Sequence, residues 1–227
     1  MSTATFDHLV VACATLDQGV RWCEATLGVT PGPGGRHAAF GTHNRLVRLD
    51  NEDAWPYAFL ELIAIDPEAP PPGRLRWFDL DNPSLQARLR DDGPQLVHFV
   101  ARSTMLDMHR WGLITVGLQP GDPVRAGRDT PRGRLEWQIL VRADGIPLAG
   151  GALPTLIQWP ADLATVHPAA HLPASGITLT RLTLRGMPAR ARDVLRLRGV
   201  QHADDPGPAL TADLSTPLGP LTLKSPT

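Results

Sequence analysis

Apolar positions along the chain gather in short runs, and segments rich in Pro and Gly separate these runs. The run Phe6–Ala12 is rich in Val and Leu, which is typical of a strand. Residues 15–29 follow with the spacing of a helix. The apolar stripe of this helix consists of Val20, Cys23 and Leu27. Thr15 or Asp17 can cap the start of the helix, and Gly28 is typical of a helix end.

Further runs complete a strand-helix-strand-strand-strand order. Residues 36–49, RHAAFGTHNRLVRL, predict two strands joined by a Gly-Thr turn. Residues 57–65, YAFLELIAI, predict one more strand. Residues 66–94 differ from both flanks because they are rich in turn residues, with a short helical pattern around residues 84–89. We therefore expect a connector between two structural units.

The same order then begins again. Residues 95–102 predict a strand, residues 103–121 a helix, and residues 133–141 and 154–159 two further strands. Aligning residues 27–32 with residues 116–121, a shift of 89 positions, places Trp22 on Trp111. Two tryptophans that meet without a gap indicate an internal duplication, and both are expected to pack against a sheet.

A shorter unit ends the chain. Residues 177–186 predict a strand, residues 187–200 a helix, and residues 208–223 a hairpin with a turn near Pro217. The fold class is thus α+β, with tandem βαβββ modules and a C-terminal partial βαββ module. The predicted boundaries are 1–66 for the first module, 67–94 for the connector, 95–168 for the second module and 169–227 for the partial third.

Composition limits the partners of this chain. The net charge is −1 and the isoelectric point about 6.7, so no basic surplus favours nucleic acid. Two cysteines among 227 residues are too few for a disulfide framework or a cysteine zinc cluster. The first residues lack the basic and long apolar regions of a signal peptide, and no apolar run has the length of a membrane span. We expect a soluble, cytoplasmic protein without a nucleic-acid or membrane partner.

Two ionisable residues lie in apolar strands and are candidates for chemistry. His8 is either a metal ligand or pocket residue, or a core histidine that a neighbouring strand satisfies. Glu61 lies in AFLELIAI, where a half-buried carboxylate is costly unless it is paired, protonated or bound to a metal. Because desolvation makes a carboxylate more basic, Glu61 is also the candidate general base.

The motifs FDHLVVA, GTHNRLVRL and FLELIAIDP resemble the glyoxalase-like domain family of the vicinal oxygen chelate superfamily, over roughly residues 5–160. The resemblance implies that paired modules curl into a cupped mixed sheet. It further implies a divalent metal (Ni, Mn, Fe or Zn) held by the first and last strands of each module. In this sequence those positions are His8 and Glu61 in the first module and Gln158 in the second.

The fourth ligand position is ambiguous. The shift of 89 positions places His8 on Val97, whereas the histidine of that strand is His98. Neighbouring residues of a strand point to opposite faces, so His98 ligates the metal only if a bulge shifts the register. Otherwise the site lacks this ligand.

Other polar and aromatic residues can complete a site. His43 and Asn44 follow the Gly-Thr turn and can reach a pocket wall, His43 as a catalytic residue and Asn44 as a substrate ligand; ordinary turn chemistry is the alternative. Trp137 and Trp159 can form an apolar wall for a ligand, although core packing explains them equally. Histidines without a partner at ligand spacing, such as His167, are expected on the surface, as is His37.

Two functions are compatible with this reading. In the first, a metal-dependent lyase, isomerase or dioxygenase acts on a small oxygenated molecule. In the second, a metal-free protein sequesters a small apolar ligand among the tryptophans, and His8, His43 and Glu61 orient it. The number of metal ligands that face the cup discriminates between them. The substrate and the oligomeric state stay open, a homodimer included.

Overall fold

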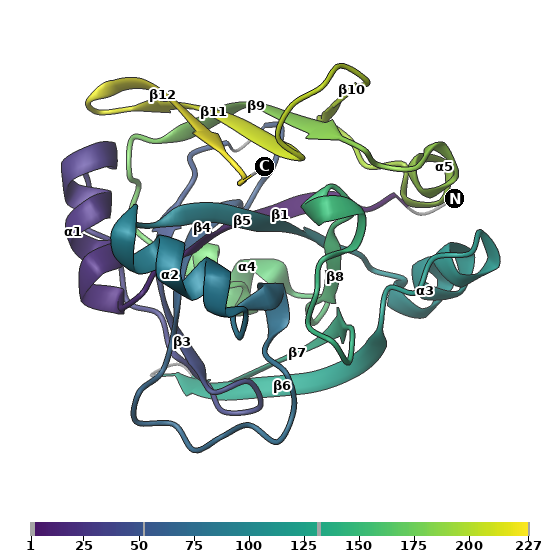
Figure 1. Ribbon diagram of the computed structural model, residues 1–227, viewed down its shortest axis with the longest axis horizontal. Helices are drawn as coiled ribbons and strands as arrows, with labels where there is room; N and C mark the ends of the chain where they lie inside the picture. The colour runs from purple at the N-terminus through teal and green to yellow at the C-terminus, as the bar shows by residue number, and fades with distance from the viewer. Residues whose placement is uncertain (1–2, 52, 131–132, 227) are drawn as a thin grey trace.

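The computed structural model of the chain describes residues 3–51, 53–130 and 133–226 (Figure 1). Eight strands form a mixed sheet with the order β2-β3-β4-β1-β5-β8-β7-β6, and four more form a second sheet. The strands of the large sheet are β1 (Thr5–Ala12), β2 (Arg36–His37), β3 (Thr42–Arg48), β4 (Phe59–Ile65), β5 (Gln95–Arg102), β6 (Asp122–Thr130), β7 (Gly133–Val141) and β8 (Thr155–Gln158). The helices that connect them are α1 (Leu16–Leu27), η1 (Trp77–Asp79), α2 (Pro83–Asp91), α3 (Leu106–Thr115), η2 (Leu148–Gly151), α4 (Leu163–Val166) and η3 (Pro168–His171).

The large sheet consists of two halves with the same strand-helix-strand-strand-strand order. Strand β1 pairs in parallel with β4, and β5 pairs in parallel with β8. The two halves meet at the centre, where β1 and β5 are antiparallel. This arrangement confirms the α+β fold and the tandem βαβββ pattern.

Strand β6 is an element that the hydrophobic pattern does not predict. Its sequence, DPVRAGRDT, carries a proline and four charged residues, and most of its side chains are half-buried or exposed. It nevertheless pairs with β7 along its whole length. Because β6 is the edge strand, its proline interrupts no further ladder on the open side.

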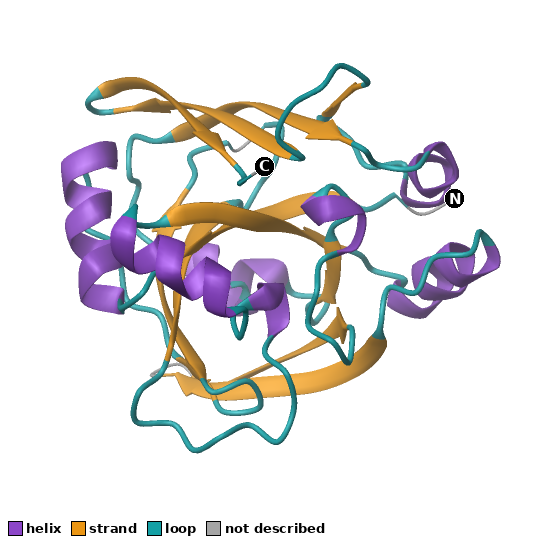
Figure 2. Cartoon of the chain, viewed as in Figure 1, coloured by secondary structure: helices purple, strands orange, loops and turns teal. Residues whose placement is uncertain are grey.

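The sheet curls until its two ends approach each other, as Figure 2 shows. A hydrogen bond joins these ends. Arg128 on β6 donates from Nη1 to Oδ1 of Asn44 on β3 at 3.3 Å. We call the concave side of this sheet the cup.

Local signals in the sequence set the helix that follows β1. The side chain of Thr15 accepts a hydrogen bond from the backbone N–H of Gln18, which caps the start of α1. Gly28 ends the helix in the left-handed conformation, with φ 76°. The buried side of α1 contains Cys23 and Leu27, as the helical spacing predicts.

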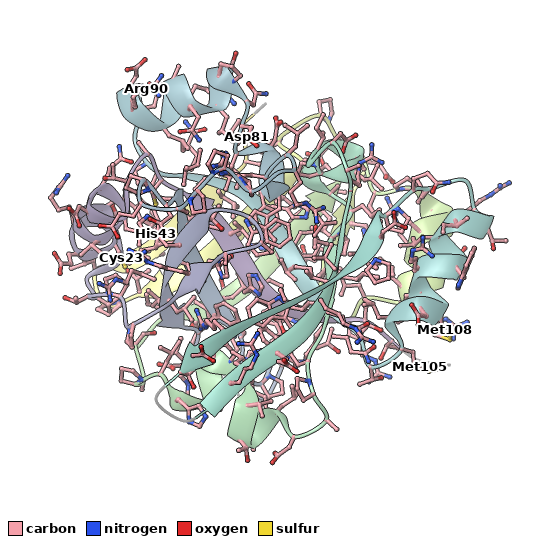
Figure 3. All side chains as sticks on the ribbon, turned by 90° about the horizontal axis from the view of Figure 1, so that it is seen from below. Cys23, His43, Asp81, Arg90, Met105 and Met108 are labelled. Carbon is pink, nitrogen blue, oxygen red and sulfur yellow. The ribbon has the colours of Figure 1, made fainter. Side chains whose placement is uncertain are left out.

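Helix α3 differs from its counterpart α1 in how it packs. Trp22 on α1 packs partly against the core, whereas Trp111 on α3 is 60 % exposed. Met105 and Met108 are also exposed beside this helix and lie at the periphery of the molecule (Figure 3). Both tryptophans therefore lie on the helix that follows the first strand of their module. The expectation that Trp111 packs against a sheet is wrong.

The C-terminal segment forms its own sheet above the large one. Its elements are β9 (Thr178–Arg185), α5 (Ala189–Leu195), β10 (Gln201–Ala203), β11 (Leu210–Thr216) and β12 (Gly219–Lys224). The strand order is β10-β9-β11-β12, and β9 pairs in parallel with the short β10. The sequence predicts the helix and the hairpin but not β10, which has only three residues. This sheet shares one apolar core with the outer face of the large sheet.

Alternation along the strands separates the two faces of the large sheet. On β1, Leu9 and Val11 belong to the core between sheet, helices and second sheet, whereas Val10 faces the apolar cluster inside the cup. On β4, Leu60 and Leu62 point outward. The side chains that alternate with these on β4, Phe59 and Glu61, line the cup. Within the described residues, no helix is long and apolar enough to cross a membrane.

Candidate functional site

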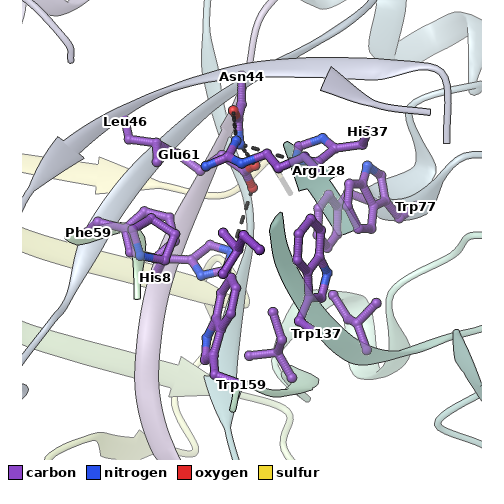
Figure 4. Close-up of a pocket in the computed structure, with 15 residues that line it drawn as sticks. His8, His37, Asn44, Leu46, Phe59, Glu61, Trp77, Arg128, Trp137 and Trp159 are labelled. Carbon is purple, nitrogen blue, oxygen red and sulfur yellow. Dashed lines mark hydrogen bonds and ion pairs between the residues drawn. The ribbon is translucent and has the colours of Figure 1, made fainter. Parts of the chain in front are cut away.

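A pocket lies inside the cup, and Figure 4 shows it with its lining side chains. Its cavity volume is about 30 Å³, enough for a few water molecules, so a larger ligand must displace lining side chains. Its aromatic lining consists of Phe59, Trp77, Phe78, Trp137 and Trp159. Its polar lining consists of His8, His37, Asn44, Glu61 and Arg128. The pocket therefore has broad apolar walls and one polar end, which is the usual composition of a small-molecule site.

Asp7 holds His8 in place from behind the pocket. Asp7 is fully buried, and its carboxylate lies 2.6 Å from Nδ1 of His8. Trp159 donates from Nε1 to the other carboxylate oxygen at 3.1 Å, and Nε2 of His167 lies 3.2 Å from that oxygen. The His8 ring also stacks on Phe59, with 4.3 Å between the centroids. Its second nitrogen, Nε2, is thereby directed toward the pocket.

The two carboxylates beside His8 favour its charged form. Burial alone would lower the pKa of His8, but the hydrogen bond to Asp7 and the interaction with Glu61 outweigh it and raise the pKa to about 9. Burial likewise opposes ionisation of Asp7, but the charges and hydrogen bonds of His167 and His8 hold its pKa far below the usual range. At neutral pH the pocket therefore contains an imidazolium next to the Glu61 carboxylate.

Glu61 is fixed by an amide from the neighbouring strand. Asn44 donates from Nδ2 to Oε1 of Glu61 at 2.6 Å, and Oε2 of Glu61 lies 3.6 Å from Nε2 of His8. The amide of Asn44 has a defined orientation because its Oδ1 accepts from the backbone N–H of Gly35 at 2.7 Å.

The charge of His8 also determines the basicity of Glu61. Burial alone would raise the pKa of Glu61, but the interaction with His8 and the hydrogen bond from Asn44 lower it. The expectation that desolvation makes Glu61 a stronger base is therefore wrong, because a cation occupies the adjacent position.

Other predicted site residues lie away from this centre. His43 is next to Asn44 on β3 and points to the opposite face, where Nδ1 lies 3.9 Å from Asp66. Gln158 lies next to Ile157, which lines the pocket, and its Oε1 accepts from the backbone N–H of Leu106 at the start of α3. The structure therefore does not bring His43 or Gln158 to His8 and Glu61.

His98 is a buried histidine that already has a partner. Its Nε2 accepts from the backbone N–H of Thr155 at 3.0 Å. Burial lowers the pKa of His98 to about 3, so the ring is neutral at physiological pH. Its side chain does not line the pocket.

The strand register identifies the counterparts of His8 and Glu61 in the second half. His8 pairs with Phe59 across β1 and β4, and Glu61 lies two residues further. Val100 pairs with Thr155 across β5 and β8, and Ile157 lies two residues further. Val100 and Ile157 have the same diagonal relation across their two strands, and both belong to the apolar cluster of the cup.

This donor set does not fit a divalent metal held by protein side chains. A catalytic metal usually has three protein ligands and a structural one has four. The pocket offers His8, Glu61 and His37, and the ring nitrogens of His37 lie against Thr42 and Asn44, while Val100 and Ile157 have no donor atoms. Among the described residues, no group of three or more His, Cys, Asp or Glu side chains is arranged to hold a metal ion.

Several residues of the pocket were not predicted from the sequence. Asp7 precedes His8, so simple alternation assigns it to the other face, but a register shift between Phe6 and His8 interrupts the pairing with β5. His37 and His167 were expected on the surface, yet both are buried. Only the position of His37, on the strand that pairs with the GTHN segment, could have indicated its role.

Comparisons with known proteins agree with this architecture. The family described as glyoxalase-like domain matches residues 6–196. A hypothetical protein from Staphylococcus aureus has a similar structure, with a TM-score of 0.62 and 13 % identity over 99 % of this chain and 87 % of that chain. This likeness shows the fold alone.

More distant likenesses involve smaller proteins. A variant of Streptomyces coelicolor methylmalonyl-CoA epimerase in complex with 2-nitronate-propionyl-CoA has a TM-score of 0.41 and 17 % identity over 71 % of this chain and 97 % of that chain. Methylmalonyl-CoA epimerase from Mycobacterium tuberculosis has a TM-score of 0.41 and 18 % identity over 70 % of this chain and 90 % of that chain. No curated protein matches the sequence.

Proposed function

The chain belongs to the glyoxalase-like domain family, and we propose that it binds a small, largely apolar carbonyl compound in the cup without a metal ion. The aromatic walls supply the apolar contacts. Trp137 and Trp159 lie 5.5 Å apart between ring centroids and form one of these walls. A flat ligand of the size of a benzene derivative suits such a surface, because aromatic rings gain energy from stacked or tilted contacts.

The observation that carries the proposal is the Nε2 side of His8, which faces the pocket beside Glu61. Asp7 occupies Nδ1, and the pKa of about 9 keeps a proton on Nε2 at neutral pH. The nearest carboxylate oxygen of Glu61 lies 3.6 Å from Nε2, which is beyond a normal hydrogen bond. A carbonyl oxygen of a ligand can accept this N–H. A buried cationic donor thus provides the polar anchor that other sites obtain from a metal.

Two apolar residues on the second half of the sheet support binding without a metal. Val100 and Ile157 add apolar surface to the cup where ligands would be needed. The anchor His8 therefore comes from the first half of the sheet, and Val100 and Ile157 of the second half add to the apolar surface.

Binding of acetophenone tests this proposal through the indole N–H signals of the protein. The chain has six tryptophans, so a ¹H–¹⁵N NMR spectrum has an internal control. We expect acetophenone to shift the signals of the tryptophans that line the pocket, which are Trp77, Trp137 and Trp159. The signals of the remaining three, Trp22, Trp55 and Trp111, should stay in place. Single Trp→Phe substitutions assign the signals.

A matched pair of variants locates the polar anchor. His8→Ala should weaken acetophenone binding about tenfold, the usual effect of removing a charged hydrogen-bond donor. His43→Ala removes a histidine from the opposite face and should leave the affinity unchanged. The proposal fails if acetophenone leaves the three pocket signals unmoved, or if it moves the exposed Trp111 signal as strongly.

A second candidate function is acid–base catalysis on the same ligand. Glu61 and His8 place a carboxylate and an imidazolium side by side at the polar end of the pocket. Glu61 would take a proton from the carbon next to the carbonyl, and that C–H electron pair would form the enol double bond. The carbonyl oxygen would receive the proton of His8 Nε2. The lowered pKa of Glu61 makes it a weak base, which is why binding is the primary proposal.

Hydrogen exchange separates this activity from binding alone. In D₂O, enolisation replaces the methyl hydrogens of acetophenone with deuterium, and the loss of their ¹H signal measures the rate. Catalysis predicts exchange above the buffer rate that Glu61→Gln abolishes while acetophenone still binds. Exchange at the buffer rate in the wild-type protein would rule the activity out.

A further inference from the structure

Arg128 is a half-buried cation that the proposed anchor does not use. It comes from β6, and its guanidinium reaches across the mouth of the cup to Oδ1 of Asn44. Gly35 lies against it so closely that a Cβ atom there would be 2.5 Å from Nη1. The guanidinium therefore occupies a space that a side chain at position 35 would fill.

The charge of Arg128 has no counter-ion among the described residues within the distance of an ion pair. The next arginine of the same hairpin, Arg134, pairs with both Asp129 and Glu136. Arg128 donates a hydrogen bond to Asn44 and interacts electrostatically with the more distant Glu61 carboxylate, and its buried Nε has no hydrogen-bond partner among the described residues. An unpaired buried donor is costly, and a charged one more so.

Arg128 also lies where the aromatic pocket meets a groove on its outer side. It lines the aromatic pocket and equally an outer groove between β6, β7 and the segment before β9, where Thr130, Arg134 and His171 lie. Figure 4 shows its side chain beside Asn44 and Glu61 at the polar end of the pocket. A molecule whose apolar body fills the pocket would present its outer end to this guanidinium.

We propose that Arg128 binds a carboxylate of the ligand, so that the natural ligand is an apolar carbonyl compound with a carboxylate end. This inference rests on the proposed function, because it assumes that the apolar body occupies the cup. A planar guanidinium with free N–H groups matches a carboxylate in geometry and charge. The nearby Glu61 carboxylate disfavours an anion with more than one charge, which argues for a carboxylate over a phosphate monoester.

An acid and its amide of equal size test the inference. The probes are 3-benzoylpropanoate and 3-benzoylpropanamide, which share the aromatic ketone and differ in the charge of the end group. Calorimetry should show that the wild-type protein binds the acid about tenfold more tightly than the amide. Arg128→Gln should remove this preference, so that the ratio of the two affinities in the variant falls to about one.

Two further variants control the result. Arg134→Gln removes a cation of the outer groove that already has carboxylate partners, and it should preserve the preference for the acid. Arg128→Lys retains the charge and should keep part of the preference, which secures the conclusion if Arg128→Gln folds poorly.

The outcomes separate the inference from the proposed function. Equal binding of acid and amide by the wild-type protein, or a preference that survives in Arg128→Gln, would overturn the role of Arg128 while the pocket still binds ketones. Failure of acetophenone and of both longer probes to bind would instead refute the proposed function, and the inference with it.

Discussion

The ion array around His8 predicts a specific dependence of stability on pH. His8 has an ordinary pKa of 6.5 in an unfolded chain and a pKa of about 9 in the folded protein. A histidine whose pKa rises on folding binds its proton more tightly in the native state. Its stabilising contribution is therefore complete below pH 6.5 and is lost as the pH rises through 9.

The size of this contribution follows from the same pKa values. Each unit of pKa difference corresponds to ~1.36 kcal/mol, so the His8 proton contributes about 3 kcal/mol to the free energy of unfolding. Such a contribution is a large part of the stability of an ordinary domain. The buried His37 and His98 do not titrate in this window, because burial lowers the pKa of His37 to about 4 and that of His98 to about 3.

Urea denaturation between pH 6.5 and 9, followed by tryptophan fluorescence, measures the effect. The wild-type protein should lose about 3 kcal/mol of unfolding free energy across this range beyond the loss in His8→Gln. The buried thiols of Cys13 and Cys23, whose pKa rises to about 12, affect both proteins equally. The reasoning is refuted if the two proteins have the same pH dependence, because the carboxylates would then not retain the His8 proton.

Three substitutions give further predictions. Thr15→Ala removes the N-cap of α1 and should lower the free energy of unfolding by about 1 kcal/mol in urea denaturation, without a change in acetophenone affinity. Gly34→Ala places a Cβ atom 2.0 Å from the backbone oxygen of Asn44 and should lower the free energy of unfolding by about 1–3 kcal/mol in urea denaturation. An unchanged free energy would show that this strand can move without cost. Asn44→Asp places a second carboxylate against Glu61 and should raise the midpoint of its titration in ¹³C NMR; an unmoved midpoint would contradict the contact.

The sequence predicts the fold well where a strand is mostly apolar or a helix carries its own capping residues. The runs at β1, β4 and β5 are mostly apolar because both faces of these central strands are buried. Helix α1 carries its own start and end signals. The edge strand β6 was missed because its ladder partner, not an apolar pattern, holds it in place.

The site was harder to predict because its residues depend on register. His8, Glu61 and Asn44 were chosen from family motifs and all line the pocket. Asp7 could not be chosen, since its direction depends on an irregularity in strand pairing that the sequence does not display. Arg128 reaches Asn44 only because the sheet curls, a contact between residues 84 positions apart.

The most direct test of the account is the Kd of acetophenone, measured by calorimetry in excess EDTA and again with Ni²⁺, Mn²⁺, Fe²⁺ or Zn²⁺. The account predicts the same affinity with and without metal, and weaker binding by His8→Ala in both conditions. Binding that appears only with one of these ions and disappears in both His8→Ala and Glu61→Ala would contradict it, because the two residues would then act as metal ligands.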